Sequence, residues 1–163
     1  MTIELRDATE ADIPYVMAVE RRPGYDKLVG RWDEAQHAEA MRDPTYRYFV
    51  ALDGGEPVGF VLIKGWNSSD HVTLIKRLAV DTPGAGRGSR IVSAALAEIF
   101  SRTEAHRVWI GCFPSNQRAR RAYEKAGFVA EGITRGSAYF YGEHHDELML
   151  AILRPEWEQR HRL

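Results

Sequence analysis

Residues 78–92 read LAVDTPGAGRGSRIV, and this stretch decides the fold of the chain. It joins a predicted strand that ends at Val80 to a predicted helix through a turn with glycines at positions 84, 86 and 88. Backbone N–H groups at the start of a helix lack a partner within the helix and attract negative charge. Glycine lets an oxyanion approach the backbone because it has no Cβ atom. The stretch predicts a phosphate site, to which Arg87 and Arg90 add positive charge, with an ordinary glycine turn as the alternative.

The spacing of this turn excludes two common phosphate loops. A Walker loop needs Gly-Lys-Ser/Thr after four intervening residues, but Gly84 is followed at that distance by Ser89-Arg90. A dinucleotide fingerprint needs a third glycine where Ser89 stands, and an acidic residue at the end of the next strand. We therefore expect neither a nucleotide triphosphatase nor a nicotinamide-dependent enzyme.

Outward from this turn, strand-like and helix-like periods alternate along the whole chain without a repeat or a linker. This alternation predicts a mixed α/β fold in a single domain over residues 1–163. Strands are predicted near residues 2–7, 46–52, 58–64, 72–80, 107–113, 128–134 and 147–153. Helices are predicted after Thr9, around residues 33–42, along the apolar stripe 91–100, and from a cap at Ser115 or Asn116 to Gly127. Residues 21–32 are predicted to form a loop.

The composition excludes several classes of protein. Hydrophobic residues at 44% and charged residues at 28% are near globular averages, which argues against a disordered, fibrous or membrane protein. With 22 basic and 23 acidic residues the net charge is −1, so no positive field favours nucleic acid or an anionic membrane. The lone Cys112 and the lack of an apolar signal segment after Met1 predict a cytoplasmic protein. No metal is predicted, because the histidines form no spaced motif, and His144 and His145 are expected to be an exposed pair.

Several short motifs, in their order and spacing, resemble the GCN5-related N-acetyltransferase (GNAT) family. They are Leu78-Ala79-Val80, Gly86-x-Gly88 before Ile91-Val92, Asn116-x-x-Ala119, Tyr123 and Gly127-Phe128. The resemblance covers about residues 70–163 closely, and the ending from Asp146 to Trp157 is similar to the ribosomal-protein-acetyltransferase-like branch. The chain departs from the family pattern in two places. Pro83 stands where Arg or Gln is expected, and Lys76 and Arg77 stand where a glutamate base is often found.

The resemblance implies a mostly antiparallel sheet with helices on both faces, which splays between the strand ending at Val80 and the strand beginning at Arg107. It implies acetyl-CoA as co-substrate, held by residues of the glycine turn, the strand before it and the helix at 116–126. These residues are Leu78, Val80, Ala85, Gly86, Arg87, Gly88, Ser89, Arg90, Asn116, Arg118, Ala119 and Tyr123. The implied reaction is direct acetyl transfer in a ternary complex to a primary amine of a small molecule or peptide. A non-catalytic sensor or interaction module that binds acyl-CoA is the alternative.

Tyr123 matches the general-acid tyrosine of the family, which would protonate the leaving thiolate. A purely structural role is the alternative, because Tyr123 shares an apolar stripe with Ala119 and Ala126. No general base is identified, since the acidic or titratable candidates are expected to be surface groups: Asp70, His71, Glu131 and Asp146. A covalent acyl-Cys112 intermediate is disfavoured because no histidine is adjacent in sequence, and a buried inert thiol is expected instead.

The acceptor side of the family is flanked by segments that are rich here in aromatic and acidic residues. They contribute Tyr25, Trp32, Tyr139, Phe140 and Tyr141, interspersed with Asp26, Asp33 and Glu143. This mixture favours a cationic amine as acceptor. Packing or a homodimer surface is the alternative use of these residues.

Overall fold

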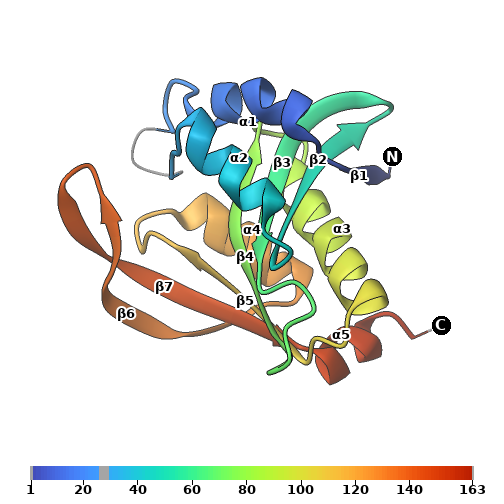
Figure 1. The fold of residues 1–163 in the computed structure, drawn as a ribbon. Helices are drawn as coiled ribbons and strands as arrows, with labels where there is room; N and C mark the ends of the chain where they lie inside the picture. The colour runs from blue at the N-terminus through green and yellow to red at the C-terminus, as the bar shows by residue number, and fades with distance from the viewer. Residues whose placement is uncertain (1, 26–29, 163) are drawn as a thin grey trace.

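Seven strands form one sheet in the order β1-β2-β3-β4-β5-β7-β6, in a computed structural model that describes residues 2–25 and 30–162 (Figure 1). The strands are β1 Ile3–Asp7, β2 Tyr46–Asp53, β3 Glu56–Lys64, β4 Val72–Val80, β5 Arg107–Cys112, β6 Val129–Phe140 and β7 Glu143–Leu153. Every neighbouring pair is antiparallel except β4 and β5, which are parallel. The predicted mixed α/β, mostly antiparallel fold is confirmed.

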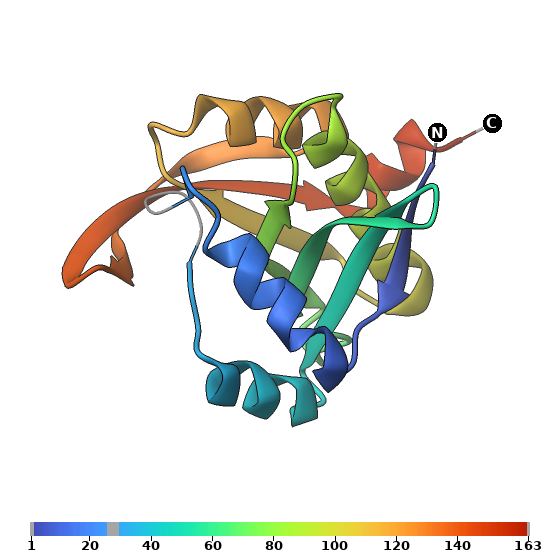
Figure 2. The same cartoon turned by 90° about the horizontal axis from the view of Figure 1, so that it is seen from above.

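Helices cover both faces of the sheet, as the view from above shows (Figure 2). They are the short 3-10 helix η1 Glu10–Asp12, then α1 Ile13–Glu20, α2 Glu34–Arg42, α3 Arg87–Arg102, α4 Gln117–Ala126 and α5 Arg154–Arg160. The helices α1 and α2 lie on one face, and α3 and α4 lie on the other. The two faces bury separate apolar clusters, the larger of them under α3 and α4.

Local sequence signals account for the two helices beside the glycine turn. The stripe predicted on α3 is buried as expected: Ile91, Val92, Ala95, Leu96, Ile99 and Phe100. Asn116 caps the start of the helix α4, because its side-chain oxygen accepts a hydrogen bond from the Ala119 N–H at 3.1 Å. It ends at Gly127, whose φ of 111° lies in the left-handed region that suits glycine.

The sheet opens between β4 and β5. These strands pair only from Val72 to Ile75 on β4 and from Arg107 to Ile110 on β5. Beyond that point β4 stays paired with β3 and β5 stays paired with β7, so the two halves of the sheet diverge. A β-bulge accompanies the opening, because the register with β3 passes from Arg77 to Ile75 and leaves Lys76 without a partner. The expected splay is confirmed.

The last two strands are longer than predicted. We expected strands at 128–134 and 147–153, but β6 and β7 continue as a hairpin that projects from the rest of the sheet (Figure 1). The register passes from Thr134 opposite Glu147 to Ala138 opposite His145, so three residues of β6 face one residue of β7. This bulge breaks the two-residue alternation by which a strand is recognised in sequence.

The prediction that His144 and His145 form an exposed pair is wrong for His145. The His144 side chain is exposed, whereas the ring of His145 is half-buried and packs against Phe113, with ring centroids 5.5 Å apart. The extended hairpin explains the difference, because successive residues of a strand point to opposite faces. No helix among the described residues has both the length and the apolar character needed to cross a bilayer. In the same residues no group of three or more His, Cys, Asp or Glu side chains is placed to hold a metal ion.

Candidate active site

The glycine turn after β4 presents backbone N–H groups at the start of α3. Gly86 caps the helix with a φ of 66°, a left-handed conformation that favours glycine. The first helical hydrogen bond runs from the Arg90 N–H to the Gly86 carbonyl at 3.1 Å. The N–H groups of Gly88 and Ser89 lie before that bond and point out of the helix end. This geometry suits a phosphate group.

The arginines of the turn are held by the end of β2. Arg90 Nη2 lies 3.4 Å from Asp53 Oδ2, and Arg87 Nε lies 3.7 Å from the same oxygen. Arg87 also donates a hydrogen bond to the Thr82 carbonyl at 3.2 Å. Because the Asp53 side chain is only 7% exposed, these contacts hold the turn against the body of the protein.

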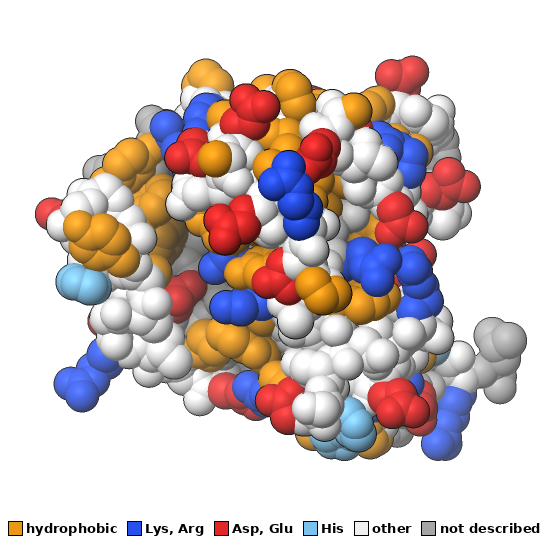
Figure 3. Space-filling view, viewed as in Figure 1, with side chains coloured by type: hydrophobic (Ala, Val, Ile, Leu, Met, Phe, Trp, Pro, Cys, Tyr) orange, Lys and Arg blue, Asp and Glu red, His pale blue; other side chains and the backbone are white. Residues whose placement is uncertain are grey.

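A cleft of about 750 Å³ occupies the opening between β4 and β5. Its walls are the glycine turn, the start of α4 and the far part of the β6–β7 hairpin. In the space-filling view this face is hollowed between the hairpin and the rest of the molecule, with basic side chains beside the hollow (Figure 3).

Most of the residues expected at the co-substrate site line this cleft. They are Leu78, Val80, Gly86, Arg87, Gly88, Ser89, Asn116, Arg118, Ala119 and Tyr123. The two others, Ala85 and Arg90, line a separate groove between the start of α3 and β1. Asn116 also caps α4, so its side-chain oxygen is engaged in starting that helix. The cleft therefore brings together ten residues from β4, the glycine turn and α4.

Tyr123 and Cys112 both line the cleft, from α4 and from β5. Tyr123 is 7% exposed and also belongs to the core, where its ring packs against Phe128. Burial raises the pKa of the Tyr123 phenol, and the nearby Cys112 raises it further, so the hydroxyl keeps its proton. Burial also raises the pKa of the Cys112 thiol, to about 11. At neutral pH Cys112 is therefore a thiol and a poor nucleophile.

An acidic and a basic side chain line the end of the cleft near the β6–β7 hairpin, and the sequence did not single them out as a pair. Glu147 on β7 and Lys76 at the β4 bulge both line the cleft. Burial lowers the pKa of the half-buried Lys76, and the charges of Arg77 and Lys64 lower it further, while Glu147 acts in the opposite direction. The Lys76 ammonium also lies 5.5 Å from the ring of Trp32.

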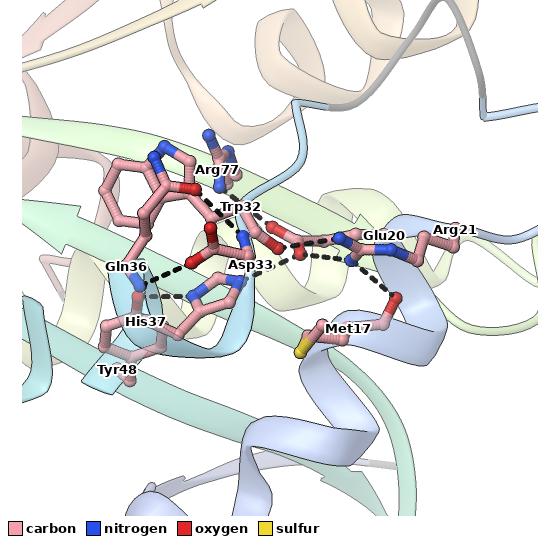
Figure 4. Close-up of polar contacts among 9 residues, drawn as sticks. All are labelled: Met17, Glu20, Arg21, Trp32, Asp33, Gln36, His37, Tyr48 and Arg77. Atoms are coloured by element: carbon pink, nitrogen blue, oxygen red, sulfur yellow. Dashed lines mark hydrogen bonds and ion pairs between the residues drawn. The ribbon is translucent and has the colours of Figure 1, made fainter. Parts of the chain in front are cut away.

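A buried polar cluster lies beneath this end of the cleft (Figure 4). The Glu20 side chain on α1 is fully buried and accepts hydrogen bonds from Arg77 Nη1 and His37 Nε2, both at 2.8 Å. On its other side, His37 Nδ1 lies 2.7 Å from the Tyr48 hydroxyl. Burial lowers the pKa of the Arg77 guanidinium, and Glu20 opposes that effect. The cluster ties α1, α2 and β2 to the part of β4 that borders the cleft.

Sequence reasoning missed this cluster and the position of Glu147. One local signal was present for Glu20, which follows Val16 by four residues on the buried side of α1. No local signal marks Glu147, because the bulge in β6 and the pairing of β5 with β7 determine its surroundings.

The proposed base candidates all lie outside the cleft. Asp70 and His71 are exposed in the turn before β4. Glu131 forms an exposed ion pair with Arg107 at 2.7 Å, which lowers the pKa of its carboxyl. Asp146 accepts a hydrogen bond from the Gly136 N–H at 2.8 Å. Each is a surface group, as expected.

The residues expected on the acceptor side divide into two groups. Tyr25, Tyr139 and Phe140 line the cleft, and the Tyr25 hydroxyl donates a hydrogen bond to the Val80 carbonyl. Trp32 lies under Lys76 and Arg77, whereas Tyr141 and Glu143 are exposed and do not line the cleft. Asp33 caps α2 by accepting the Gln36 N–H at 2.8 Å. Asp26 lies outside the described residues.

Comparisons with known proteins agree with this geometry. A family model described as "Acetyltransferase (GNAT) family" matches residues 10–128. The probable N-acetyltransferase YjcK of Bacillus subtilis is 33% identical over 102 residues, which are 63% of this chain and 48% of the relative. The putative ribosomal N-acetyltransferase YdaF of the same organism is 35% identical over 75 residues, which are 44% of this chain and 41% of the relative. The chain thus spans about half the length, or less, of these curated relatives.

Among solved structures, that of AAC(6')-Ib in complex with paromomycin and acetyl-CoA superimposes with a TM-score of 0.83. The superposition covers 99% of both chains at 21% sequence identity. At this identity the likeness shows a common fold.

Proposed function

The chain belongs to the acetyltransferase (GNAT) family, and on that premise we propose that it transfers an acetyl group from acetyl-CoA to a primary amine. The observation that carries the proposal is the position of the first N–H groups of α3. They open onto a cleft at the point where β4 and β5 separate. A phosphate site and an exposed strand edge in one cleft suit a long ligand with a phosphorylated end and an extended arm.

In this proposal the N–H groups of Gly88 and Ser89 hold the diphosphate of acetyl-CoA. Arg118 and Arg121 project from α4 into the same cleft and supply positive charge for the remaining phosphate. The edge of β4 that faces the cleft beyond Ile75, where Tyr25 holds the Val80 carbonyl, pairs with the amide-containing arm, as an added strand would. Acetyl-CoA supplies an activated acyl group, and the residues of the chain align it with the amine.

Tyr123 is the proposed proton donor to the sulfur that leaves. The phenol carries a proton at neutral pH, the form that a donor needs, and the burial that raises its pKa also makes it a weaker acid. Cys112 lies close to it but is disfavoured as a nucleophile, since its thiol has a pKa of about 11 and a covalent step needs thiolate. We therefore favour direct transfer in a ternary complex.

The acceptor is proposed to be an amine of a small molecule or peptide. Two similar proteins support this class: AAC(6')-Ib, whose structure is a complex with paromomycin and acetyl-CoA, and the putative ribosomal N-acetyltransferase YdaF. Of the acidic residues expected to attract a cationic amine, Asp33 and Glu143 do not line the cleft, whereas Glu147 on β7 does. We therefore propose an acceptor with one amine close to Glu147.

Release of free thiol tests the proposal. The protein is mixed with acetyl-CoA and a panel of amines, peptides and aminoglycosides, and free CoA is measured with a thiol reagent. We expect CoA release that depends on one class of amine and falls about 100-fold or more in Tyr123→Phe. Tyr46→Phe, on β2 outside the cleft, is the matched control and should retain activity. Calorimetric binding of acetyl-CoA without turnover on any amine would indicate a non-catalytic acyl-CoA sensor instead.

A further inference from the structure

Among residues 2–25 and 30–162, Glu147 provides the one carboxylate that lines the cleft. It lies on β7, while the opposite side of the cleft carries β4 and the glycine turn. The amine of an acceptor is mostly an ammonium ion at neutral pH and has to lose a proton before it attacks. A carboxylate in the cleft is therefore a candidate acceptor of that proton.

The bulge in β6 orients the Glu147 side chain. Residues 135–137 face the single residue Asp146, and this places Ser137 beside Glu147. The Ser137 hydroxyl donates a hydrogen bond to Glu147 Oε1 at 2.9 Å. One oxygen of the carboxylate is thus fixed by a neighbour on the adjacent strand.

The other oxygen lies over β5 at a glycine. A Cβ atom built on Gly111 would lie 2.8 Å from Glu147 Oε2, closer than real Cβ contacts come. The carboxylate therefore fills space that the side chain of any other residue at position 111 would take. No hydrogen-bond partner for Oε2 is found in the described part of the chain, so this oxygen is available to a ligand.

The titratable or charged groups that face Glu147 come from three strands. Lys76 on β4 and Cys112 on β5 both interact with its charge, and His145 lies two residues earlier on β7 itself. From β6 the neighbouring group is the Ser137 hydroxyl. Of these groups only Glu147 is a carboxylate, the group type that attracts an ammonium ion entering the cleft.

We propose that Glu147 binds the ammonium group of the acceptor and accepts its proton, and that Ser137 and Gly111 position the carboxylate for this. This assignment rests on the proposed acetyl transfer. The first proton passes from the ammonium to Glu147 and then to solvent. The neutral amine forms the new C–N bond as the C–S bond breaks. Tyr123 gives its proton to the departing sulfur. The second proton leaves the nitrogen and replaces the proton that Tyr123 has lost. One amide, one thiol and one released proton result.

The test compares Glu147→Gln with the wild type across pH. The amide retains the size of the side chain and a hydrogen bond to Ser137 but takes up no proton. We expect kcat/KM to fall about 100-fold or more at pH 7. The ratio of the wild-type kcat/KM to that of Glu147→Gln should shrink by about tenfold for each pH unit toward the pKa of the acceptor amine. The reason is that the fraction of free amine rises about tenfold per pH unit, and free amine needs no base. A merely structural role would give a deficit that does not change with pH.

Three further variants sharpen the test. Asp146→Asn changes the neighbouring exposed carboxylate while retaining a side-chain acceptor for Gly136, and it should leave the rate and pH profile unchanged. Glu147→Asp retains a carboxylate and should recover part of the kcat/KM that Glu147→Gln loses at pH 7. Gly111→Ala should displace the carboxylate and lower kcat.

Calorimetry provides a readout apart from turnover. Coenzyme A should bind Glu147→Gln as it binds the wild type, while the acceptor amine should bind the coenzyme A complex more weakly. If the wild type releases no CoA with any amine, the proposed function itself fails. If the wild type is active and Glu147→Gln retains its rate, or loses it equally at every pH, only the assignment of Glu147 fails.

Discussion

Replacing Arg77 with methionine should destabilise the protein far more than an ordinary ion-pair mutation. Arg77 Nη1 lies 2.8 Å from Glu20 Oε2, and the two side chains are 11% and 0% exposed. Methionine fills a similar volume but removes the positive charge, so the carboxylate of Glu20 remains in the interior without its main counterion. The remaining partners of that carboxylate are His37 and the partly exposed Arg21.

The magnitude follows from burial. Breaking a buried pair by removing one partner costs about 3–5 kcal/mol, because an uncompensated charge is left behind. Since Arg21 Nη1 still lies 3.3 Å from Glu20, we expect the lower end, about 3 kcal/mol. At about 2–4 °C per kcal/mol for a chain of this size, the melting temperature should fall by roughly 6–12 °C.

Urea denaturation followed by tryptophan fluorescence measures this change. Arg42→Met is the matched control, because Arg42 pairs with Glu10 at a similar 2.9 Å but is 71% exposed. Such a surface pair contributes about 1 kcal/mol or less. The double variant Glu20→Gln/Arg77→Met should be more stable than the sum of the single changes predicts, by about 1–3 kcal/mol. Equal losses for Arg77→Met and Arg42→Met, or no coupling with Glu20, would refute the reasoning.

Three other predictions concern the cleft and its strands. Gly59→Ala should cost about 1–3 kcal/mol or more in urea denaturation, since its Cβ atom would lie 2.2 Å from the Ala79 carbonyl oxygen and push β3 away from β4; an unchanged midpoint would contradict this close approach. Gly86→Val should weaken acetyl-CoA binding about tenfold in calorimetry, because a left-handed φ of 66° costs about 1–2 kcal/mol in a residue with a side chain; unaltered affinity would show that the turn does not hold the ligand. Cys112 should react with iodoacetamide about 100-fold more slowly in the folded protein than in urea at pH 8, because its pKa is raised from 9.0 to about 11 and thiolate is the reactive form; fast labelling that abolishes turnover would favour an acyl-cysteine mechanism.

Features that depend on neighbouring residues were predictable from the sequence. The apolar stripe of α3 follows from the spacing of its residues, and the ends of α4 follow from Asn116 and Gly127. The order of these elements around the glycine turn, together with the resemblance they carry, indicated the family that the comparison later showed. Each of these signals needs only a few consecutive residues and the fixed geometry of a helix or strand.

The ends of β6 and β7 were not predictable in the same way. Bulges and left-handed residues such as Gly136 and Tyr141 interrupt the alternation of the hairpin. Pairing between the two strands, rather than the pattern within either one, extends β6 to Phe140 and makes β7 begin at Glu143. The same pairing places Ser137 beside Glu147.

The sequence by itself determined the local elements, their order and the glycine turn that joins β4 to α3. Only the tertiary structure decided where Glu147 lies and that Glu20, His37 and Arg77 share one buried cluster. Glu20 is 17 residues from His37 and 57 residues from Arg77, so nothing local links them. A buried charge has to find an opposite charge and hydrogen-bond donors wherever the packing of helix on sheet brings them. That packing is set by strand register and bulges, which emerge only when the whole sheet assembles.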